Sequence, residues 1–315
     1  MKRVLLASPR GYCAGVDRAI ETVTRTLELS GPPVYVRKQI VHNAHVVAEL
    51  EALGAVFVDS EDDVPPGATV VFSAHGVAPA VHQAAAARGL DVIDAACPLV
   101  TKVHVEARSF AARGYTIVLI GHAGHEEVEG TAGEAPDATV LVQTVAEAEA
   151  VDLDGRPRLA YLTQTTLSVD ETREIVAVLE RRYPHVVGPR KDDICYATQN
   201  RQDAVKALVP DVDLVLVVGS RNSSNSNRLV EVARTRGVPA YLIEDETAID
   251  EDWLAGVETV GLTSGASAPE RLVRRVCEWF GRRGVTEIRA HRSVTESVVF
   301  GLPAAVRAPG AARTA

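Results

Sequence analysis

Short apolar runs recur along the whole chain, and each is followed by a polar loop and then, in most cases, by a segment with helical spacing. The runs are rich in Val, Ile and Leu and cover residues 3–7, 33–37, 69–73, 91–93, 116–120, 158–163, 214–218 and 259–263. Runs of this length between turn-forming residues predict buried strands. The helical segments that follow them include residues 46–53, 78–88, 169–182, 227–236 and 269–281. This alternation predicts an α/β fold with mainly parallel sheets.

The cysteines are the first sign of chemistry in this pattern. Four cysteines in a long chain of 315 residues, expected to be cytoplasmic, suggest ligands, catalytic groups or inert core residues rather than a disulfide framework. Cys13, Cys97 and Cys195 recur at intervals of about 90 residues, the size of a small α/β domain. This spacing hints at three similar domains around one site, but it is weak support for a cluster because familiar cluster motifs use close spacings.

The local sequence around three of the cysteines favours metal ligation. Residues 10–16, 94–101 and 191–198 each place a cysteine in a polar, turn-prone setting directly before a helix-like segment. A helix N-terminus lowers the pKa of a thiol and favours the thiolate, which is the form that binds metal. Cys277 differs, because it lies on an amphipathic segment, residues 272–280, and its expected role is core packing.

The charge balance restricts the partners. The chain has 33 basic and 42 acidic residues and a net charge of −9, which argues against a broad attraction to nucleic acid or anionic lipid. The first seven residues mimic a signal peptide, but Ser8-Pro9-Arg10 ends the apolar run early. No run approaches the roughly 18 apolar residues of a membrane span. We therefore expect a cytoplasmic protein without nucleic-acid or membrane partners.

Longer motifs make a family resemblance specific. Together with the cysteine segments, the chain from about residue 3 to residue 302 closely resembles the 4-hydroxy-3-methylbut-2-enyl diphosphate reductases, which catalyse the last step of the methylerythritol phosphate route to isoprenoids. The matching motifs, all in one order, are residues 39–43, 73–77, 121–131, 163–170, 222–229 and 264–269.

The resemblance implies a domain arrangement. Members of this family have three similar α/β domains in a pseudo-threefold arrangement around a central 4Fe-4S cluster, and the N-terminal strand joins the third domain. The implied domains are residues 14–97, residues 98–194, and residues 1–13 with 195–281. The strand and helix pattern fades after residue 281, so residues 282–315 are predicted to be a tail. Its end, residues 303–315, is rich in Ala, Pro and Arg and is predicted to be disordered.

The resemblance also implies the roles of individual residues. Three protein thiolates would leave the fourth iron of the cluster open to the substrate hydroxyl, where it could act as a Lewis acid. Glu127 matches the carboxylate that delivers a proton, and Thr165 matches the hydroxyl that orients the substrate alcohol. The implied ligands of the cluster are Cys13, Cys97 and Cys195. The implied diphosphate contacts are His42, His75, His125, Ser223, Asn225 and Ser267, with Ser224 beside them.

The histidines carry a prediction about pH. A protonated histidine donates two hydrogen bonds, and a bound diphosphate favours that charged form. Substrate affinity should therefore weaken as the pH rises. Glu126 and Glu129 lie among other acidic residues, where a solvated helix face is the simpler interpretation, and both are left out of the predicted site.

The implied reaction removes the hydroxyl with two electrons and two protons and yields isopentenyl and dimethylallyl diphosphate. The sequence shows no G-x-G-x-x-G dinucleotide motif after its first strand and no evident flavin motif. The electrons must therefore come from outside the chain, and a ferredoxin or flavodoxin is the expected partner.

Two rival interpretations stay open. A metal-dependent phosphohydrolase could use the same histidines and glutamates around zinc or magnesium, although the zinc-protease motif is excluded because Glu129 stands where its second histidine would be. A redox sensor could use the cluster as its signal, but the chain lacks a basic segment that would read DNA.

Overall fold

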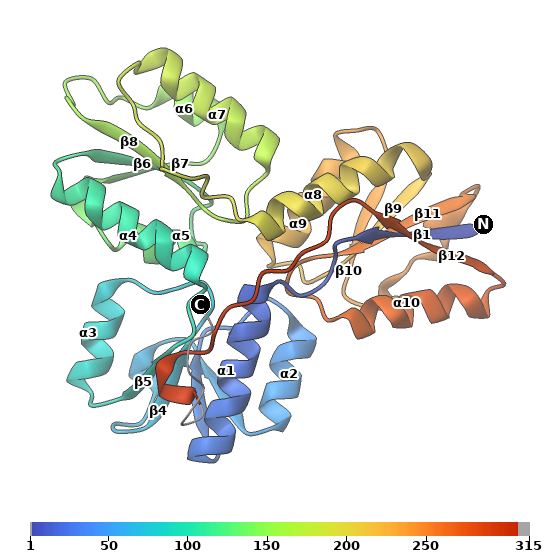
Figure 1. Cartoon of the computed structure of the whole chain (residues 1–315), viewed down its shortest axis with the longest axis horizontal. Helices are drawn as coiled ribbons and strands as arrows, with labels where there is room; N and C mark the ends of the chain where they lie inside the picture. The colour runs from blue at the N-terminus through green and yellow to red at the C-terminus, as the bar shows by residue number, and fades with distance from the viewer. Residues whose placement is uncertain (1, 308–315) are drawn as a thin grey trace. The chain divides into compact units, whose positions relative to one another are not determined.

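The computed structural model describes residues 2–307, and within this range three sheets form, in which the strands pair in parallel (Figure 1). Their strand orders are β10-β9-β11-β1-β12, β3-β2-β4-β5 and β7-β6-β8. The predicted α/β class with parallel sheets is thereby confirmed.

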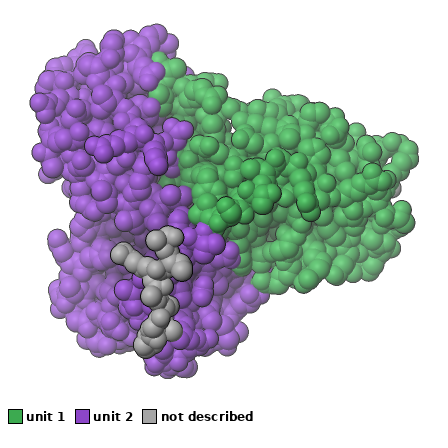
Figure 2. Space-filling view, viewed as in Figure 1, with its two compact units in different colours: residues 1–13, 165–177, 194–298 green, residues 14–164, 178–193, 299–315 purple. Residues whose placement is uncertain are grey.

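The chain divides into two compact units, which Figure 2 shows in different colours. Unit one comprises residues 1–13, 165–177 and 194–298, and unit two comprises residues 14–164, 178–193 and 299–315. Unit one contains the five-stranded sheet, and unit two contains the other two sheets. The division into three domains at residues 97 and 194 stays a prediction.

The sheet of unit one is covered on both faces by helices. Alternate residues of its inner strand β9 enter different cores: Leu214, Leu216 and Val218 pack with helix α10, whereas Val215 and Val217 pack with α8 and α9. Because both faces are covered, all five residues of β9 are buried and apolar, as is typical of parallel sheets. The elements of this unit are β1 (Arg3–Ser8), α8 (Tyr196–Leu208), β9 (Leu214–Val218), α9 (Ser224–Arg234), β10 (Ala240–Ile243), β11 (Thr259–Ser264), α10 (Glu270–Arg282) and β12 (Glu287–Arg292).

Unit two repeats the strand–loop–helix pattern in two smaller sheets. Helix α7 (Val169–Arg182) is shared between the units. The elements around the four-stranded sheet are α1 (Ala14–Ser30), β2 (Val34–Arg37), α2 (Ala44–Ala52), β3 (Ala55–Val58), β4 (Thr69–Phe72), α3 (Pro79–Ala87) and β5 (Asp91–Asp94). Those around the three-stranded sheet are α4 (Pro98–Ala112), β6 (Thr116–Ile120), α5 (Glu126–Ala132), β7 (Thr139–Val142), α6 (Val145–Ala150) and β8 (Leu159–Thr163).

All eight predicted strands are present, and the four strands that the pattern missed all lie at sheet edges. These are β3, β7, β10 and β12. An edge strand is covered less completely than a central one, so its sequence does not need a continuous apolar run. The six residues of β12, for example, are all exposed or only partly buried.

The expectation of a tail from residue 282 is wrong for β12. This strand pairs with β1 in parallel from Glu287 opposite Arg3 to Arg292 opposite Ser8. Farther on, a short 3-10 helix (Ala304–Val306) buries Val306, which is only 1 % exposed. The rest of the segment predicted to be disordered, residues 308–315, lies outside the described residues. Among the described residues, no helix is long and apolar enough to span a membrane.

Two glycines let helix α9 approach the sheet of unit one closely. A Cβ atom placed on Gly265, just after β11, would lie 2.0 Å from Ser226 Oγ, and one placed on Gly219, just after β9, would lie 2.2 Å from the same atom. Both distances are far below van der Waals contact. The start of α9, where Ser223 and Asn225 lie, is therefore held against the ends of two strands.

Replacing Gly265 with alanine tests this close packing. We expect Gly265→Ala to lower the free energy of unfolding by about 1–3 kcal/mol, because the added methyl overpacks a rigid contact. Urea unfolding followed by circular dichroism measures the change. The matched control is Gly281→Ala, since Gly281 lies near the end of helix α10, where an added Cβ would meet nothing within 4 Å. Equal stability of the Gly265→Ala variant and the wild type would contradict the packing argument.

Candidate active site

Several candidate residues lie at or directly before the start of a helix. Cys97 is the N-cap of α4, His125 of α5, Cys195 of α8 and Ser223 of α9. Cys13 directly precedes α1. The first N–H groups of a helix and its dipole favour negative charge, so these positions suit a thiolate or a phosphate group.

Three histidines gather in unit two. The ring centroids of His42 and His75 lie 4.1 Å apart with the rings stacked, and the His125 ring is 5.4 Å from His42 and 5.7 Å from His75, edge-on to both. His42 follows β2, His75 follows β4 and His125 follows β6. The structure thus brings together all three histidines that the sequence predicted as diphosphate contacts.

Backbone hydrogen bonds join the loops that carry Cys97, His75 and His42. The N–H of Cys97 donates to the carbonyl of Ala74 at 2.9 Å, and the N–H of Ala74 donates to the carbonyl of Ile40 at 3.1 Å. Ala74 precedes His75, and Ile40 lies two residues before His42. The loops are therefore fixed to one another at the carboxyl edge of the four-stranded sheet.

Burial keeps two of these histidines, His42 and His125, neutral in the ligand-free chain. Desolvation, together with the neighbouring imidazoles of His75 and His125, lowers the pKa of His42 to about 2. Desolvation and His75 also lower the pKa of His125 to about 4, against a smaller opposing effect of Glu126. At neutral pH both rings are uncharged, so an anion that binds there must either accept from neutral N–H groups or bring protons with it.

The hydrogen bonding of His125 selects one neutral tautomer. Its Nδ1 accepts from the backbone N–H of Glu127 at 3.1 Å, which caps helix α5. An accepting Nδ1 has no proton, so the proton of the neutral ring is on Nε2. His125 can then donate from Nε2 without loss of the cap.

The glutamates of α5 differ from the prediction at one position. Glu126 was left out as part of a solvated face, but its Oε2 lies 3.3 Å from Nδ1 of His75 and accepts from Ser73 Oγ at 3.4 Å. Its side chain is 20 % exposed. The solvated-face interpretation is wrong for Glu126, because its carboxylate contacts His75 and Ser73. Glu129 is exposed as expected, and Glu127, the predicted proton donor, is only 2 % exposed.

His42, His75 and Glu126 are also the one group of potential metal ligands found among the described residues, with ligand atoms within 4.8 Å of one another. The stacking of the two rings speaks against a shared ion. Imidazole binds a metal through a lone pair in the ring plane, and two stacked rings, inclined by only 21°, keep their lone pairs in two nearly parallel planes, which do not meet at one ion. This geometry disfavours the zinc or magnesium phosphohydrolase.

In unit one, a chain of hydrogen bonds connects two of the predicted ligand cysteines. The N–H of Thr198 donates to Cys195 Sγ at 3.4 Å, and Thr198 Oγ1 lies 3.3 Å from the same sulfur. Asn225 Nδ2 donates to Thr198 Oγ1 at 3.4 Å.

The chain continues through the loop after β11. Asn225 Oδ1 accepts from the N–H of Ala266 at 2.8 Å, and the carbonyl of Ala266 accepts from the N–H of Cys13 at 3.2 Å. The sequence pattern gave Thr198 no role. Its position three residues after a capping cysteine is the signal that could have identified it.

The remaining predicted residues of unit one adjoin this chain. The N–H of Cys195 donates to the carbonyl of Thr165 at 3.2 Å, and Ser224 Oγ donates to the carbonyl of Thr166 at 3.3 Å. Thr165 is 4 % exposed and Ser267, next to Ala266, is 7 % exposed. Together with Ser223, the cap of α9, these residues form the group of predicted site residues in unit one.

The cysteines fit an iron–sulfur group by their chemistry. None of the four is in a disulfide, and each is partly buried. The hydrogen bonds to Cys195 Sγ and the helix starts after Cys13, Cys97 and Cys195 stabilise thiolates, which iron requires. Cys277 lacks such surroundings: it packs against the apolar core around α10, where desolvation raises the pKa of its thiol.

Comparison with known proteins identifies the family of this chain. The family described as LytB protein matches residues 4–280. The 4-hydroxy-3-methylbut-2-enyl diphosphate reductase of Acidothermus cellulolyticus is 61% identical over 307 residues, which cover 97% of this chain and 90% of that protein. The protein of the same name from Mycolicibacterium paratuberculosis is 61% identical over 307 residues, with 97% and 92% covered.

Two solved structures extend the likeness to three dimensions. The E-1-hydroxy-2-methyl-but-2-enyl-4-diphosphate reductase from Plasmodium falciparum superposes with a TM-score of 0.94 at 40% identity, covering 97% of this chain and 96% of that one. A structure of (E)-4-hydroxy-3-methyl-but-2-enyl diphosphate reductase, described as the terminal enzyme of the non-mevalonate pathway, superposes with a TM-score of 0.62 at 32% identity. The match covers 90% of this chain and 100% of that one. The chain therefore belongs to the LytB protein family.

Proposed function

We propose that this chain reduces (E)-4-hydroxy-3-methylbut-2-enyl diphosphate to isopentenyl and dimethylallyl diphosphate, the terminal step of the non-mevalonate route to isoprenoids. The observation that carries the proposal is that three cysteines precede or cap helices while Cys277 packs in a core. The identities above, over nearly the full length of both chains, support it.

Cys13, Cys97 and Cys195 would hold a 4Fe-4S cluster. With three thiolates, such a cluster supplies electrons and one iron without a protein ligand, and this iron can act as a Lewis acid toward the substrate hydroxyl. The protein supplies binding and protons. An external carrier of the ferredoxin or flavodoxin type would supply the two electrons, and a cytoplasmic location suits such a carrier.

The histidines and the start of α9 would bind the diphosphate. His125 offers Nε2–H in its neutral form, and protonation of His42 would add a donor and a positive charge. His75 lies against the His42 ring and would contact the same group. Ser223 and Asn225 lie at the N-terminus of an eleven-residue helix, where the helix dipole favours phosphate. These local contacts would offset the overall negative charge of the chain.

Glu127 and Thr165 would handle protons. Loss of hydroxide from an allylic carbon needs a proton on the leaving oxygen, and a carboxyl group in a buried position can deliver it. Glu127 is 2 % exposed and Thr165 is 4 % exposed, so neither exchanges protons freely with bulk water. We propose that Glu127 protonates the hydroxyl by way of Thr165.

The first test compares two cysteine variants. Anaerobically purified wild type should be brown, contain iron and turn over the allylic diphosphate with a reduced electron carrier. Cys195→Ser should lose most of its iron and at least about 10²-fold in rate, because a hydroxyl is a poor ligand for iron. Cys277→Ser should keep the iron content and the rate of the wild type. A colourless, inactive wild type would overturn the reductase assignment, and a zinc content would favour the phosphohydrolase.

The second test concerns the proton donor. Glu127→Gln removes the transferable proton and keeps the shape, so kcat should fall by about 10²- to 10⁴-fold with little change in cluster content. The control is Glu129→Gln, since Glu129 lies on the same helix but is exposed. Full activity of Glu127→Gln would exclude Glu127 from the proton path.

The third test measures protons taken up on binding. The pKa values of about 2 for His42 and about 4 for His125 leave both neutral at pH 7, and a bound dianion raises them. Binding should therefore take up protons, and affinity should fall as the pH rises toward 8. Calorimetry with inorganic diphosphate in two buffers of different ionisation enthalpy gives the number taken up.

A matched variant assigns the uptake. His42→Gln should take up fewer protons than the wild type under the same conditions. Affinity that stays constant from pH 6 to pH 8, without proton uptake, would mean that neutral rings bind the anion.

A further inference from the structure

Glu296 stands out in the segment that follows β12. Residues 293–299 have no regular secondary structure, and all of them are exposed except Glu296, whose side chain is only 16 % exposed. The segment is attached at its beginning, where the N–H and Oγ of Ser293 both donate to the carbonyl of Ser8, at 3.0 and 2.8 Å. The segment therefore inserts one acidic side chain into unit one.

Glu296 meets an arginine that is fully buried. Oε1 of Glu296 accepts from Arg201 Nη1 at 3.0 Å and Oε2 accepts from Nη2 at 3.4 Å, while Asn200 Nδ2 donates to Oε1 at 3.0 Å. The Arg201 side chain has no exposed surface. A buried guanidinium requires a counter-charge and a full set of acceptors, and Glu296 is its one carboxylate partner among residues 2–307.

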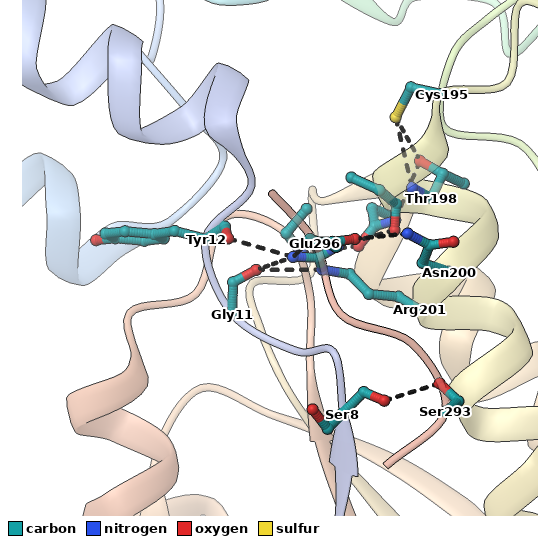
Figure 3. Close-up of polar contacts among 12 residues, drawn as sticks. Ser8, Gly11, Tyr12, Cys195, Thr198, Asn200, Arg201, Ser293 and Glu296 are labelled. Carbon is teal, nitrogen blue, oxygen red and sulfur yellow. Dashed lines mark hydrogen bonds and ion pairs between the residues drawn. The ribbon is translucent and has the colours of Figure 1, made fainter. Parts of the chain in front are cut away.

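The other bonds of Arg201 go to backbone carbonyls beside the two cysteines of this unit (Figure 3). Nε and Nη2 donate to the carbonyl of Gly11 at 3.1 and 2.7 Å, and Nη2 also reaches the carbonyl of Tyr12 at 3.2 Å. Nη1 donates to the carbonyl of Ala197 at 2.9 Å. Gly11 and Tyr12 directly precede Cys13, and Ala197 lies in the first turn of the helix that Cys195 caps.

The Arg201 side chain thus hydrogen-bonds to backbone carbonyls close to both Cys13 and Cys195. The Gly11 N–H is fixed separately by Ser264 Oγ at 2.9 Å, and the positive φ of +71° at Gly11 turns the chain so that its carbonyl meets the guanidinium. The planar fork of arginine can serve several acceptors in one plane, which the ammonium of lysine cannot do.

We propose that Arg201 and Glu296 are positioning residues that set the separation of the Cys13 and Cys195 thiolates and so retain the iron–sulfur cluster. This inference rests on the proposed function, because it presupposes that the two cysteines are ligands. Neither residue needs to touch substrate. The proposed reaction assigns no catalytic group to the segment after β12. In this proposal the segment helps to retain the cofactor.

The test measures cluster loss and unfolding in the same samples. Reconstituted holoprotein is mixed anaerobically with an excess of an iron chelator, and visible absorbance and iron release are followed while tryptophan fluorescence reports unfolding. Glu296→Gln keeps the shape but leaves the buried guanidinium without its charge partner, and we expect cluster loss about tenfold faster than in the wild type. Arg201→Lys should act in the same direction.

The matched control is Glu287→Gln, which removes a carboxylate from the neighbouring strand β12. Glu287 pairs with Arg289 on the surface, with side chains 38% and 72% exposed, so its loss should leave cluster release unchanged. The proposal requires that Glu296→Gln releases iron before it unfolds.

Two outcomes overturn the inference alone. If Glu296→Gln loses its cluster at the same rate as Glu287→Gln, the ion pair does not retain the cluster. If iron is released only as fast as the protein unfolds, the ion pair contributes only to the stability of the fold. A wild type that binds no iron would instead overturn the proposed function.

Discussion

The carboxyl edges of parallel strands are the constraint on which the candidate site depends. In each sheet the strands run the same way, so every strand ends at the same edge, and β1, β5, β6 and β9 are each followed by a loop and a helix. The N-terminal groups of those helices provide N–H donors and favour negative charge. Cys97, His125 and Ser223 occupy equivalent cap positions after β5, β6 and β9, and Cys195 caps α8, which follows helix α7. The start of a helix would suit a thiolate or a diphosphate at each of these places.

Burial determines the protonation state of two histidines near these helix starts, His42 and His125. The cost of desolvating charge keeps His42 and His125 neutral without a ligand, so the chain, with its net charge of −9, does not hold a permanent cationic patch there. A bound anion would favour the protonated form of these two rings.

The sequence predicts the parts of the fold that are covered on both sides. Inner strands such as β9 need apolar residues at every position and are visible in the pattern, whereas β12, with the sequence EIRAHR, is an edge strand held by backbone hydrogen bonds that its side chains do not reveal. The same limit applies in the site. The histidines were found through their motifs, but the role of Glu126 depends on which way α5 faces, and spacing alone does not give this.

Arg201 shows what a finer interpretation of the pattern could have found. On α8 it lies in register with the buried positions Ala197, Ala204 and Leu208, where an amphipathic helix normally places an apolar residue. A charged residue on that stripe must find a counter-ion and acceptors inside the protein, so its presence predicts a buried polar network. The pattern of apolar and polar residues does not predict which groups Arg201 contacts. Three of its partners are backbone carbonyls, and the fourth, Glu296, lies in a segment without periodicity. A buried charged residue on a helix that begins at a candidate ligand can therefore indicate a positioning residue. Comparison of motifs alone does not give this indication.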